Sequence, residues 1–328
     1  MPDHPTPEPD ETGRVPDCST CGRHPSACRR LQAAARAGDR VLDALAADVA
    51  GSFTLLTSTV AVTESMVATL VHDGEYRAPS LRGGALQVTP GRVALRIAPE
   101  RVVGAVLADN PDEHLEATMI ALLDDRGAPV HRTWVRDGAD RLIVESFDHR
   151  DAWGTSGAEA AGLLSTMPTP PEPAPWRDGD LPAQIDAILA DDGKDRYHEL
   201  VASDELHAIP VDLLPQVFEF LCGSATPVGV AVFHGGVAQV CAGPLHTALR
   251  EGDQLLAGYA DAALEIDLAL VDGCGLVRSH GVHGPTTSIE LYDAAGRCAA
   301  LLTQFGLVDA GVHADWEAMC TSLRTAAR

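Results

Sequence analysis

The chain has 328 residues, 45% of them hydrophobic, and no apolar run near the ~20 residues that a membrane-spanning helix needs. The sequence therefore predicts a soluble globular protein, and its length favours two domains. Forty-seven acidic residues against 24 basic residues give a formal charge of -23, which argues against nucleic acid and anionic lipid as partners. Any anionic ligand must then depend on a few arginines placed close to it.

The N-terminal segment, residues 1–29, is acidic and rich in proline. It lacks the basic start and apolar stretch of a secretory signal, which indicates a cytoplasmic protein. Cys18, Cys21 and Cys28, with His24 between them, supply enough soft ligands for one tetrahedral zinc ion. Structural zinc sites usually draw a second ligand pair from a distant element, so a flexible tail without metal is the alternative.

In the first half, residues 30–49 carry alanine and leucine at helical spacing and predict a helix. Residues 93–98 read as a strand. A hairpin follows from Met119, because two runs of alternating apolar residues flank a turn that begins at Asp124 and contains Gly127.

The middle of the chain, residues 167–176, has five prolines in ten residues, which disfavours helix and sheet and predicts an extended linker. Beyond it, Asp180 can cap a helix that has Pro182 in its first turn. Asp212 opens another helix, which Gly223 ends. Both helices carry an apolar stripe that is typical of core packing.

The sequence contains an internal repeat, in which segments of the first half match segments of the second half at one constant offset, the distance from Met119 to Ser288. MIALLDDRGAPVHRTWV, from Met119, matches SIELYDAAGRCAALLTQF, from Ser288, and the same offset aligns the strand at residues 93–98 with the one around residues 263–268. Two duplicated strand sets predict an α+β fold, a tandem repeat of two similar domains, each a broad antiparallel β-sheet with flanking helices. We expect the two halves to fold separately. The predicted organisation is a tail over residues 1–29, an N-terminal repeat over 30–166, a linker over 167–176 and a C-terminal repeat with the ligand cleft over 177–328.

Several motifs stand in a fixed order. CGLVRSHGVHGPTTSIELYDAAGRCAALLTQFG, from Cys274, is similar to W-V-V-R-K-P-T-x-D-G-x-V-T-S-L-E-L-F-D-x-x-G followed by F-G, and VAQVCAGPL, from Val237, to I-Q-I-H-T-G-P-V. In the first repeat, TESMVATLVHDGEY, from Thr63, and VALRIAPERV, from Val93, match more faintly. These are motifs of the hemin-degrading factor family, the bacterial heme carriers and heme-breaking proteins called HemS, ChuS or HmuS, which the chain resembles over roughly residues 40–325.

The resemblance implies that heme is the cofactor and lies in a cleft beside the second repeat. It implies heme transport or oxidative heme degradation for iron acquisition, a heme-uptake or reductase partner protein, and possible assembly as a homodimer. Family members bind iron through one histidine on the first helix after the linker and hold the propionates with basic side chains. The family's propionate arginine is matched by Arg196, and Arg278 persists in the second-repeat motif. Arg96 and Arg101 match arginines that would reach the distal face, although exposed strand charge is an alternative for both.

The chain departs from the family pattern at the iron ligand. Counting forward from Trp176 and backward from Arg196 leads both times to Ala183, whose methyl group cannot bind iron. Ser279, Val308, Cys241 and Glu64 stand where the family has lysine, arginine, histidine and arginine. Losing cations and adding an acid beside a dianionic ligand weakens its binding unless other residues substitute.

A shifted ligand must therefore be sought. His280 and His283 are the favoured candidates, because H-G-V-H replaces P-T-x-D in the loop that faces heme in the family. His198 and His207 are further candidates, although a lone histidine is more often a surface or hydrogen-bonded residue. Cys241 could offer a thiolate, although a buried structural thiol is the commoner case.

Three hypotheses remain at this stage. In the first, the chain binds heme through a shifted ligand, as carrier or as degrading enzyme. In the second, it binds another planar or anionic small molecule, or a tetrapyrrole without iron. In the third, it is a scaffold that has lost the site and acts through a partner protein.

Overall fold

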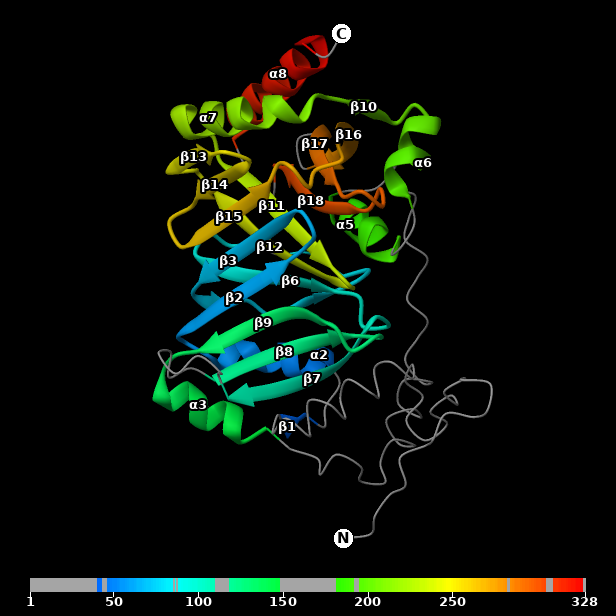
Figure 1. Ribbon diagram of the computed structural model, residues 1–328. Coiled ribbons are helices and arrows are strands. Elements are labelled where there is room, and N and C mark those ends of the chain that lie inside the picture. Colours follow the sequence, from blue (N-terminus) through cyan, green and yellow to red (C-terminus); the bar gives the residue numbers. More distant parts are fainter. Residues whose placement is uncertain are drawn as a thin grey trace, which may run out of the picture.

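The structure, a computed structural model, describes residues 40–42, 46–84, 86, 88–109, 118–147, 181–191, 195–281, 284–304 and 309–326. The predicted tail, the linker and the three N-terminal cysteines lie outside these residues. The predicted fold class is confirmed, because two large and mainly antiparallel sheets are accompanied by a few helices (Figure 1). In the described part of the chain each sheet has nine strands.

The first sheet has the strand order β1-β7-β8-β9-β2-β3-β15-β14-β13. Its strands are β1 (Arg40–Val41), β2 (Thr59–Glu64), β3 (Ala68–Asp73), β7 (Val102–Asp109), β8 (Thr118–Asp124), β9 (Pro129–Val135), β13 (Thr247–Glu251), β14 (Gln254–Gly258) and β15 (Ala262–Asp267). The second sheet has the order β10-β16-β17-β18-β11-β12-β6-β4, and β5 also pairs with β6. Its strands are β4 (Glu75–Tyr76), β5 (Ser80–Leu81), β6 (Arg92–Ile97), β10 (Leu206–Ala208), β11 (Val228–His234), β12 (Val237–Gly243), β16 (Gly273–Gly281), β17 (Gly284–Tyr292) and β18 (Cys298–Thr303).

The strand registers reproduce the sequence repeat. Leu70 of β3 pairs with Leu264 of β15, and Gln239 of β12 pairs with Leu95 of β6. The repeat offset that carries Met119 to Ser288 also carries Leu95 to Leu264 and Leu70 to Gln239. The two pairings are therefore equivalent, and an approximate two-fold relation connects the repeats.

The same pairings show that the repeats exchange strands. β6 belongs to the first repeat but lies in the second sheet, whereas β13, β14 and β15 belong to the second repeat but extend the first sheet. This differs from the expectation of one self-contained sheet in each half. Alternating apolar residues identify a strand, but they do not specify its pairing partner, because the neighbouring strand is chosen by packing across the whole molecule.

Short helices cover the sheets. They are α2 (Ala46–Ser52), α3 (Gly138–Glu145), α5 (Leu181–Ala190), α6 (Arg196–Ala202), α7 (Leu214–Ser224) and α8 (Ala310–Ala326), with 3-10 turns at η1 (Phe53–Leu55) and η2 (Val211–Leu213). The predicted helix over 30–49 is confirmed only from Ala46. Arg40 and Val41 form β1 against β7 instead, because the open edge of that strand offers backbone partners that outweigh a weak helix propensity. The helices predicted near Pro182 and after Asp212 are confirmed as α5 and α7, but α7 begins at Leu214 and runs through Gly223 to Ser224, so Gly223 does not end it.

Helix α5 lies on one face of the second sheet. Ile185, Ile188 and Leu189 of α5 join the buried cluster on this face. The strands beneath contribute small side chains, among them Ala94, Ala231 and Ala238, as well as larger ones such as Phe233 and Tyr292. Alanine methyl groups allow the helix to approach the sheet closely, so polar side chains of α5 reach partners on the strands.

A cut within residues 167–176 tests the strand exchange. After insertion of a protease site there and cleavage, the two halves should elute together from a size-exclusion column in native buffer and separate only in denaturant. The β3–β15 and β12–β6 pairings hold each half to the other. Two folded halves that elute separately without denaturant would contradict the exchange.

Candidate functional site

The position that the resemblance gives to the iron ligand is on α5. Ala183 lies in the first turn of this helix and is partly buried. Arg196 does not lie on this helix, which ends at Ala190. Instead, Asp195 caps α6 by accepting a hydrogen bond from the backbone N–H of His198 at 3.1 Å, and Arg196 is the first residue of α6.

The next turn of α5 is tied to β6 by a buried ion pair. Arg96 of β6 donates from Nε to Asp186 at 2.7 Å and from Nη2 to the other carboxylate oxygen at 2.6 Å. Its Nη1 donates to the carbonyl of Gly84 at 2.7 Å. The Arg96 side chain is 0% exposed. Arg96 is thus neither an exposed strand charge nor available to a ligand, because its donors join α5 to the sheet.

Arg196 takes part in a second buried network. It donates from Nε and Nη2 to Glu290 of β17 at 2.9 and 3.0 Å, and from Nη1 to Asp191 at 3.3 Å. Gln184 of α5 and Tyr292 donate to the same Glu290 carboxylate at 2.8 and 2.5 Å. Burial alone would raise the pKa of Glu290, but the Arg196 guanidinium and these hydrogen bonds hold it below its ordinary value. The pair therefore stays charged.

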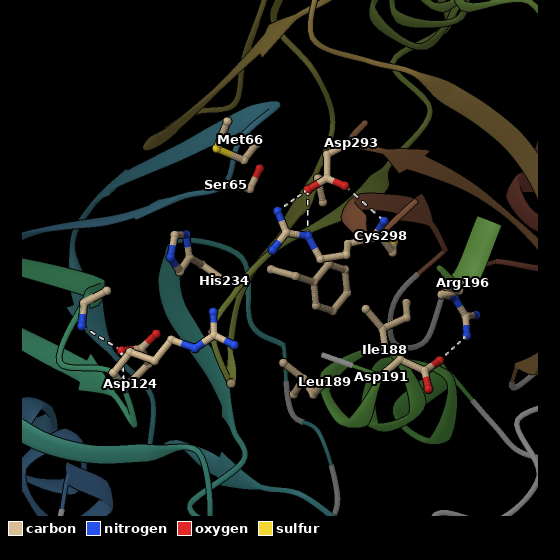
Figure 2. A pocket seen from close by; sticks show the side chains of 17 residues that line it. Ser65, Met66, Asp124, Ile188, Leu189, Asp191, Arg196, His234, Asp293 and Cys298 are labelled. Atoms are coloured by element: carbon tan, nitrogen blue, oxygen red, sulfur yellow. Dashed lines mark hydrogen bonds and ion pairs between the residues drawn. The ribbon is translucent and has the colours of Figure 1, made fainter. Parts of the chain in front are cut away.

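A cavity of about 310 Å³ lies beside the C-terminal end of α5, where hairpin turns of both repeats converge (Figure 2). Its lining residues are Ser65, Met66, Asp124, Arg126, Ala128, Ile188, Leu189, Asp191, Arg196, Phe233, His234, Gly235, Gly236, Asp293, Arg297, Cys298 and Ala299. Ser65 and His234, Asp124 and Asp293, and Ala128 and Arg297 are equivalent positions of the two repeats, because the same offset separates each pair. The cavity therefore lies across the approximate two-fold relation of the repeats.

The β11–β12 turn places His234 at this cavity. The two residues after it, Gly235 and Gly236, both have positive φ, at 47° and 97°, as a tight two-residue hairpin requires. A Cβ on Gly235 would collide with the side chain of Val130, and one on Gly236 would lie 2.7 Å from Cβ of Arg101. The second repeat can thus dock closely on the first only because this turn lacks side chains. Arg101 is half-buried behind it, and burial lowers its pKa.

The acidic residues of the cavity are already bonded. Asp124 accepts from the backbone N–H groups of Arg126 and Ala128 at 3.0 and 2.6 Å. Arg297 donates from Nε and Nη2 to the same carboxylate oxygen of Asp293, Oδ2, at 2.9 and 2.6 Å. Within the part of the chain that the structure covers, the guanidinium of Arg126 has no carboxylate partner. Among the described residues of the lining, Arg126 is therefore the guanidinium that can meet an anion without breaking an ion pair, although the carboxylates of Asp124, Asp191 and Asp293 line the same cavity.

Arg278 lies elsewhere. It lines a second cavity of about 380 Å³, together with Asp204, Glu205, Leu206, His207, Leu276 and Arg324, and the two linings share no residue. The Arg278 side chain is 59% exposed and lies 3.7 Å from Glu317 of α8. His280 is on β16, and His283 falls outside the described residues. Arg196 and Arg278 are thus not brought together in one site.

Two other predicted iron ligands, His198 and Cys241, are unsuited to that role, because His198 bonds to an acid and Cys241 is buried. The His198 ring is 71% exposed and bonded to Asp195 at 2.7 Å. His131, which the sequence reasoning passed over, bonds through one ring nitrogen to Thr63 and through the other to Tyr76, both at 2.8 Å, and burial lowers its pKa to about 3. Burial raises the pKa of the Cys241 thiol, which disfavours a thiolate ligand.

The metal prediction stays open at the N-terminus, because Cys18, Cys21 and Cys28 lie outside the described residues. Among the residues with described positions, no group of three His, Cys, Asp or Glu side chains could hold a metal ion. None of the helices that the structure describes has the length and apolar character needed to span a membrane.

The sequence reasoning missed His234, Arg126 and Arg297. The available signal was the glycine pair after His234, and the position of Arg126 and Arg297 in the duplicated turns that begin at Asp124 and Asp293. Nothing in the sequence alone indicates that these turns meet, since their meeting depends on the strand exchange.

No family model matches the chain, and no curated protein matches it. Solved structures do. Apo-PhuS, a heme-binding protein from Pseudomonas aeruginosa, is 20% identical, with a TM-score of 0.68 over 89% of this chain and 90% of that chain. ChuS, an E. coli heme oxygenase, is 16% identical, with a TM-score of 0.72 over 92% of each chain. At these identities the likeness establishes the fold.

Replacing Asp186 tests whether its ion pair with Arg96 holds α5 against the sheet. Asp186→Ala leaves the Arg96 charge buried without its partner and should lower the free energy of unfolding in urea by about 3–5 kcal/mol. Asp73→Ala is the matched control, because it breaks an exposed ion pair in which Asp73 lies 2.6 Å from Arg136. It should lower the free energy of unfolding by about 0–1 kcal/mol. Equal effects of the two substitutions would contradict a structural role for the buried pair.

Proposed function

We propose that this chain binds heme and carries it within the cell for iron acquisition. The observation that supports this most directly is the cavity, which Ile188, Leu189 and Phe233 line beside the exposed guanidinium of Arg126. It occurs in a fold that the chain shares over about nine-tenths of its length with a heme-binding protein and a heme oxygenase.

The chemistry of the cavity fits the parts of heme. The macrocycle is planar and apolar, and Ile188, Leu189 and Phe233 supply an apolar surface for it. The two propionates require cationic donors, which Arg126 can supply directly and Arg297 only by leaving Asp293. The cavity, about 310 Å³, is at the lower end of the roughly 300–1,000 Å³ of small-molecule sites, so an edge of heme would stay in solvent. An exposed edge suits a carrier, because a partner protein can contact the ligand before release.

The cleft along α5 that the resemblance suggests fits heme less well. Ala183 offers no ligand, and the next polar residues, Gln184 and Asp186, already bond to the sheet. Opening this cleft would break the buried pair of Arg96. Bound iron would supply oxygen chemistry if the protein also degrades heme, whereas the residues of the cavity bind and orient the ligand.

A second candidate is a tetrapyrrole without iron, or another planar anion. The alanine at position 183 favours it, because such a ligand needs the arginines and the apolar wall but no axial ligand. A scaffold without a ligand is the third outcome that the experiment below distinguishes.

Titration of the full chain followed by absorbance tests these alternatives. Hemin should bind with saturation at one equivalent and give a shifted Soret band. Arg126→Glu should weaken binding about tenfold, because it replaces a cation near the propionates by an anion. Arg250→Glu is the matched control, since Arg250 is an exposed arginine of another hairpin, and it should leave the affinity unchanged.

Parallel titrations separate the candidates. Metal-free protoporphyrin that binds as tightly as hemin, with no ligand band in the hemin spectrum, would replace heme by the second candidate. If neither hemin nor protoporphyrin shows saturable binding, the remaining hypothesis is a scaffold without a ligand. Decay of the Soret band on addition of a reductant and oxygen would show degradation in addition to carriage.

A further inference from the structure

We infer that the cavity of about 380 Å³ between β10, β16 and α8 is a second ligand site. Its ligand is a small zwitterion of the α-amino acid type, with one ammonium group and one carboxylate group. The juxtaposition that carries the inference is two guanidinium groups, one imidazole and two carboxylates around a single cavity. This cavity shares no lining residue with the one at the junction of the repeats, so the inference does not depend on the proposed function.

Three elements bring these side chains together (Figure 1). β10 follows α6 and pairs with β16, so that His207 lies directly opposite Leu276. Arg278 is two residues further along β16, and alternate residues of a strand share a face. Leu276 packs in one buried cluster with Cys320 of α8, so this face is the one that α8 covers. Arg324 of α8 therefore reaches the cavity from the side of the helix.

Both guanidinium groups are placed to meet a carboxylate. Burial raises the pKa of the Cys320 thiol, whereas the charges of Arg324 and Arg278 both act in the opposite direction, so the two groups lie near the same atom. Arg278 is 59% exposed and lies 3.7 Å from Glu317, which is too far for a hydrogen bond. Arg324 has no carboxylate partner among the residues that the structure covers. A ligand carboxylate can therefore bind to both arginines.

Two buried nitrogen atoms of the lining lack a hydrogen-bond partner in the described part of the chain. They are Nε2 of His207 and Nε of Arg324. Buried polar atoms are bonded in the great majority of cases, because an unpaired one has lost water without a replacement. Nε of Arg324 only donates, so its partner must be an acceptor such as a carboxylate oxygen. Two such atoms at one cavity indicate that a polar group of a ligand bonds there.

Asp204 supplies a carboxylate at a position where the backbone favours glycine. It lies just beyond α6 with a φ of 59°, and its N–H and that of Glu205 donate to the carbonyls of Val201 and Leu200 at 3.2 and 2.9 Å. Glycine commonly ends a helix in this left-handed conformation, which it adopts without strain. Among the described residues other than glycine, only Asp204 and Ala225 have a positive φ. A strained residue at the mouth of a cavity is typical of a binding site.

The charges of the lining select the class of ligand. Arg278 and Arg324 attract an anionic group, whereas Asp204 and Glu205 repel a second anionic group and attract a cation. A dianion such as phosphate therefore suits the cavity poorly, and a molecule with one group of each sign suits it well. The cavity is at the lower end of the roughly 300–1,000 Å³ of small-molecule sites, which favours a ligand of amino-acid size.

Calorimetric titration of the full chain with each of the standard L-amino acids tests the class of ligand. At least one of them should bind with saturation and with a Kd on the order of 1 mM or tighter. Its amide, which lacks the carboxylate, and its N-acetyl derivative, which lacks the ammonium group, should both bind at least ~10-fold more weakly, since each loses a charge-assisted hydrogen bond. Inorganic phosphate should not compete with it.

Asp204→Gly separates a role in binding from a structural one. It removes the carboxylate and relieves the left-handed conformation, so the variant should be at least as stable in urea as wild type and yet bind the amino acid at least ~10-fold more weakly. Ala225→Gly is the matched control, because Ala225 ends α7 with a φ of 51°. It should be at least as stable as wild type and keep the wild-type affinity.

Arg324→Gln should weaken binding to a similar extent, because it removes the cation that faces the ligand carboxylate. Arg250→Gln is its control, since Arg250 is an exposed arginine of another hairpin, and it should leave the affinity unchanged.

Three results would overturn the inference. The first is that none of the amino acids shows saturable binding. The second is that the N-acetyl derivative or phosphate binds as tightly as the free amino acid, which would mean a site for anions alone. The third is an unchanged affinity in Asp204→Gly or in Arg324→Gln. Failure of hemin to bind would overturn the proposed function and leave this inference in place, because the two cavities have no residue in common.

Discussion

The exchange of strands between the repeats is the constraint on which the rest of the structure depends. β6 pairs with β12 of the other repeat, and β15 pairs with β3. These two pairings set the relative position of the repeats, and they bring the turns after β2, β8, β11 and β17 to one place. The cavity, the rigid β11–β12 turn and the contact of His234 with Glu64 all follow from it.

Buried charge explains why α5 is a structural helix in this chain. Asp186 neutralises Arg96, and Glu290 neutralises Arg196. Removing one member of such a pair leaves a charge in a medium that solvates it poorly. Two of the four arginines that the family resemblance assigned to heme, Arg96 and Arg196, thus act first on the fold. The positive charge that can reach heme comes instead from surface turns, where Arg126 has no carboxylate partner among the described residues.

Much of the fold could be predicted from the sequence, because a strand and a turn are local patterns. The duplicated turns after Asp124 and Asp293 and the offset between Leu95 and Leu264 identified the repeat, and the structure reproduces that offset in its registers. The pairing of β6 with the other repeat could not be predicted, because it depends on contacts between distant segments. The burial of Arg96 could not be predicted for the same reason, since its partner Asp186 lies 90 residues away in the sequence.

The approximate two-fold relation also bears on how a ligand would lie. At the cavity, the backbone of one repeat is matched by the backbone of the other, so a flat molecule that itself has near two-fold symmetry meets similar surroundings whichever way round it enters. Side chains alone distinguish the two ways. His234 of the second repeat is equivalent to Ser65 of the first, and Arg297 is equivalent to Ala128. The second repeat therefore contributes the imidazole, and the two repeats place their guanidinium groups differently, Arg126 in the first and Arg297 in the second, so these side chains favour one orientation of a ligand over the other.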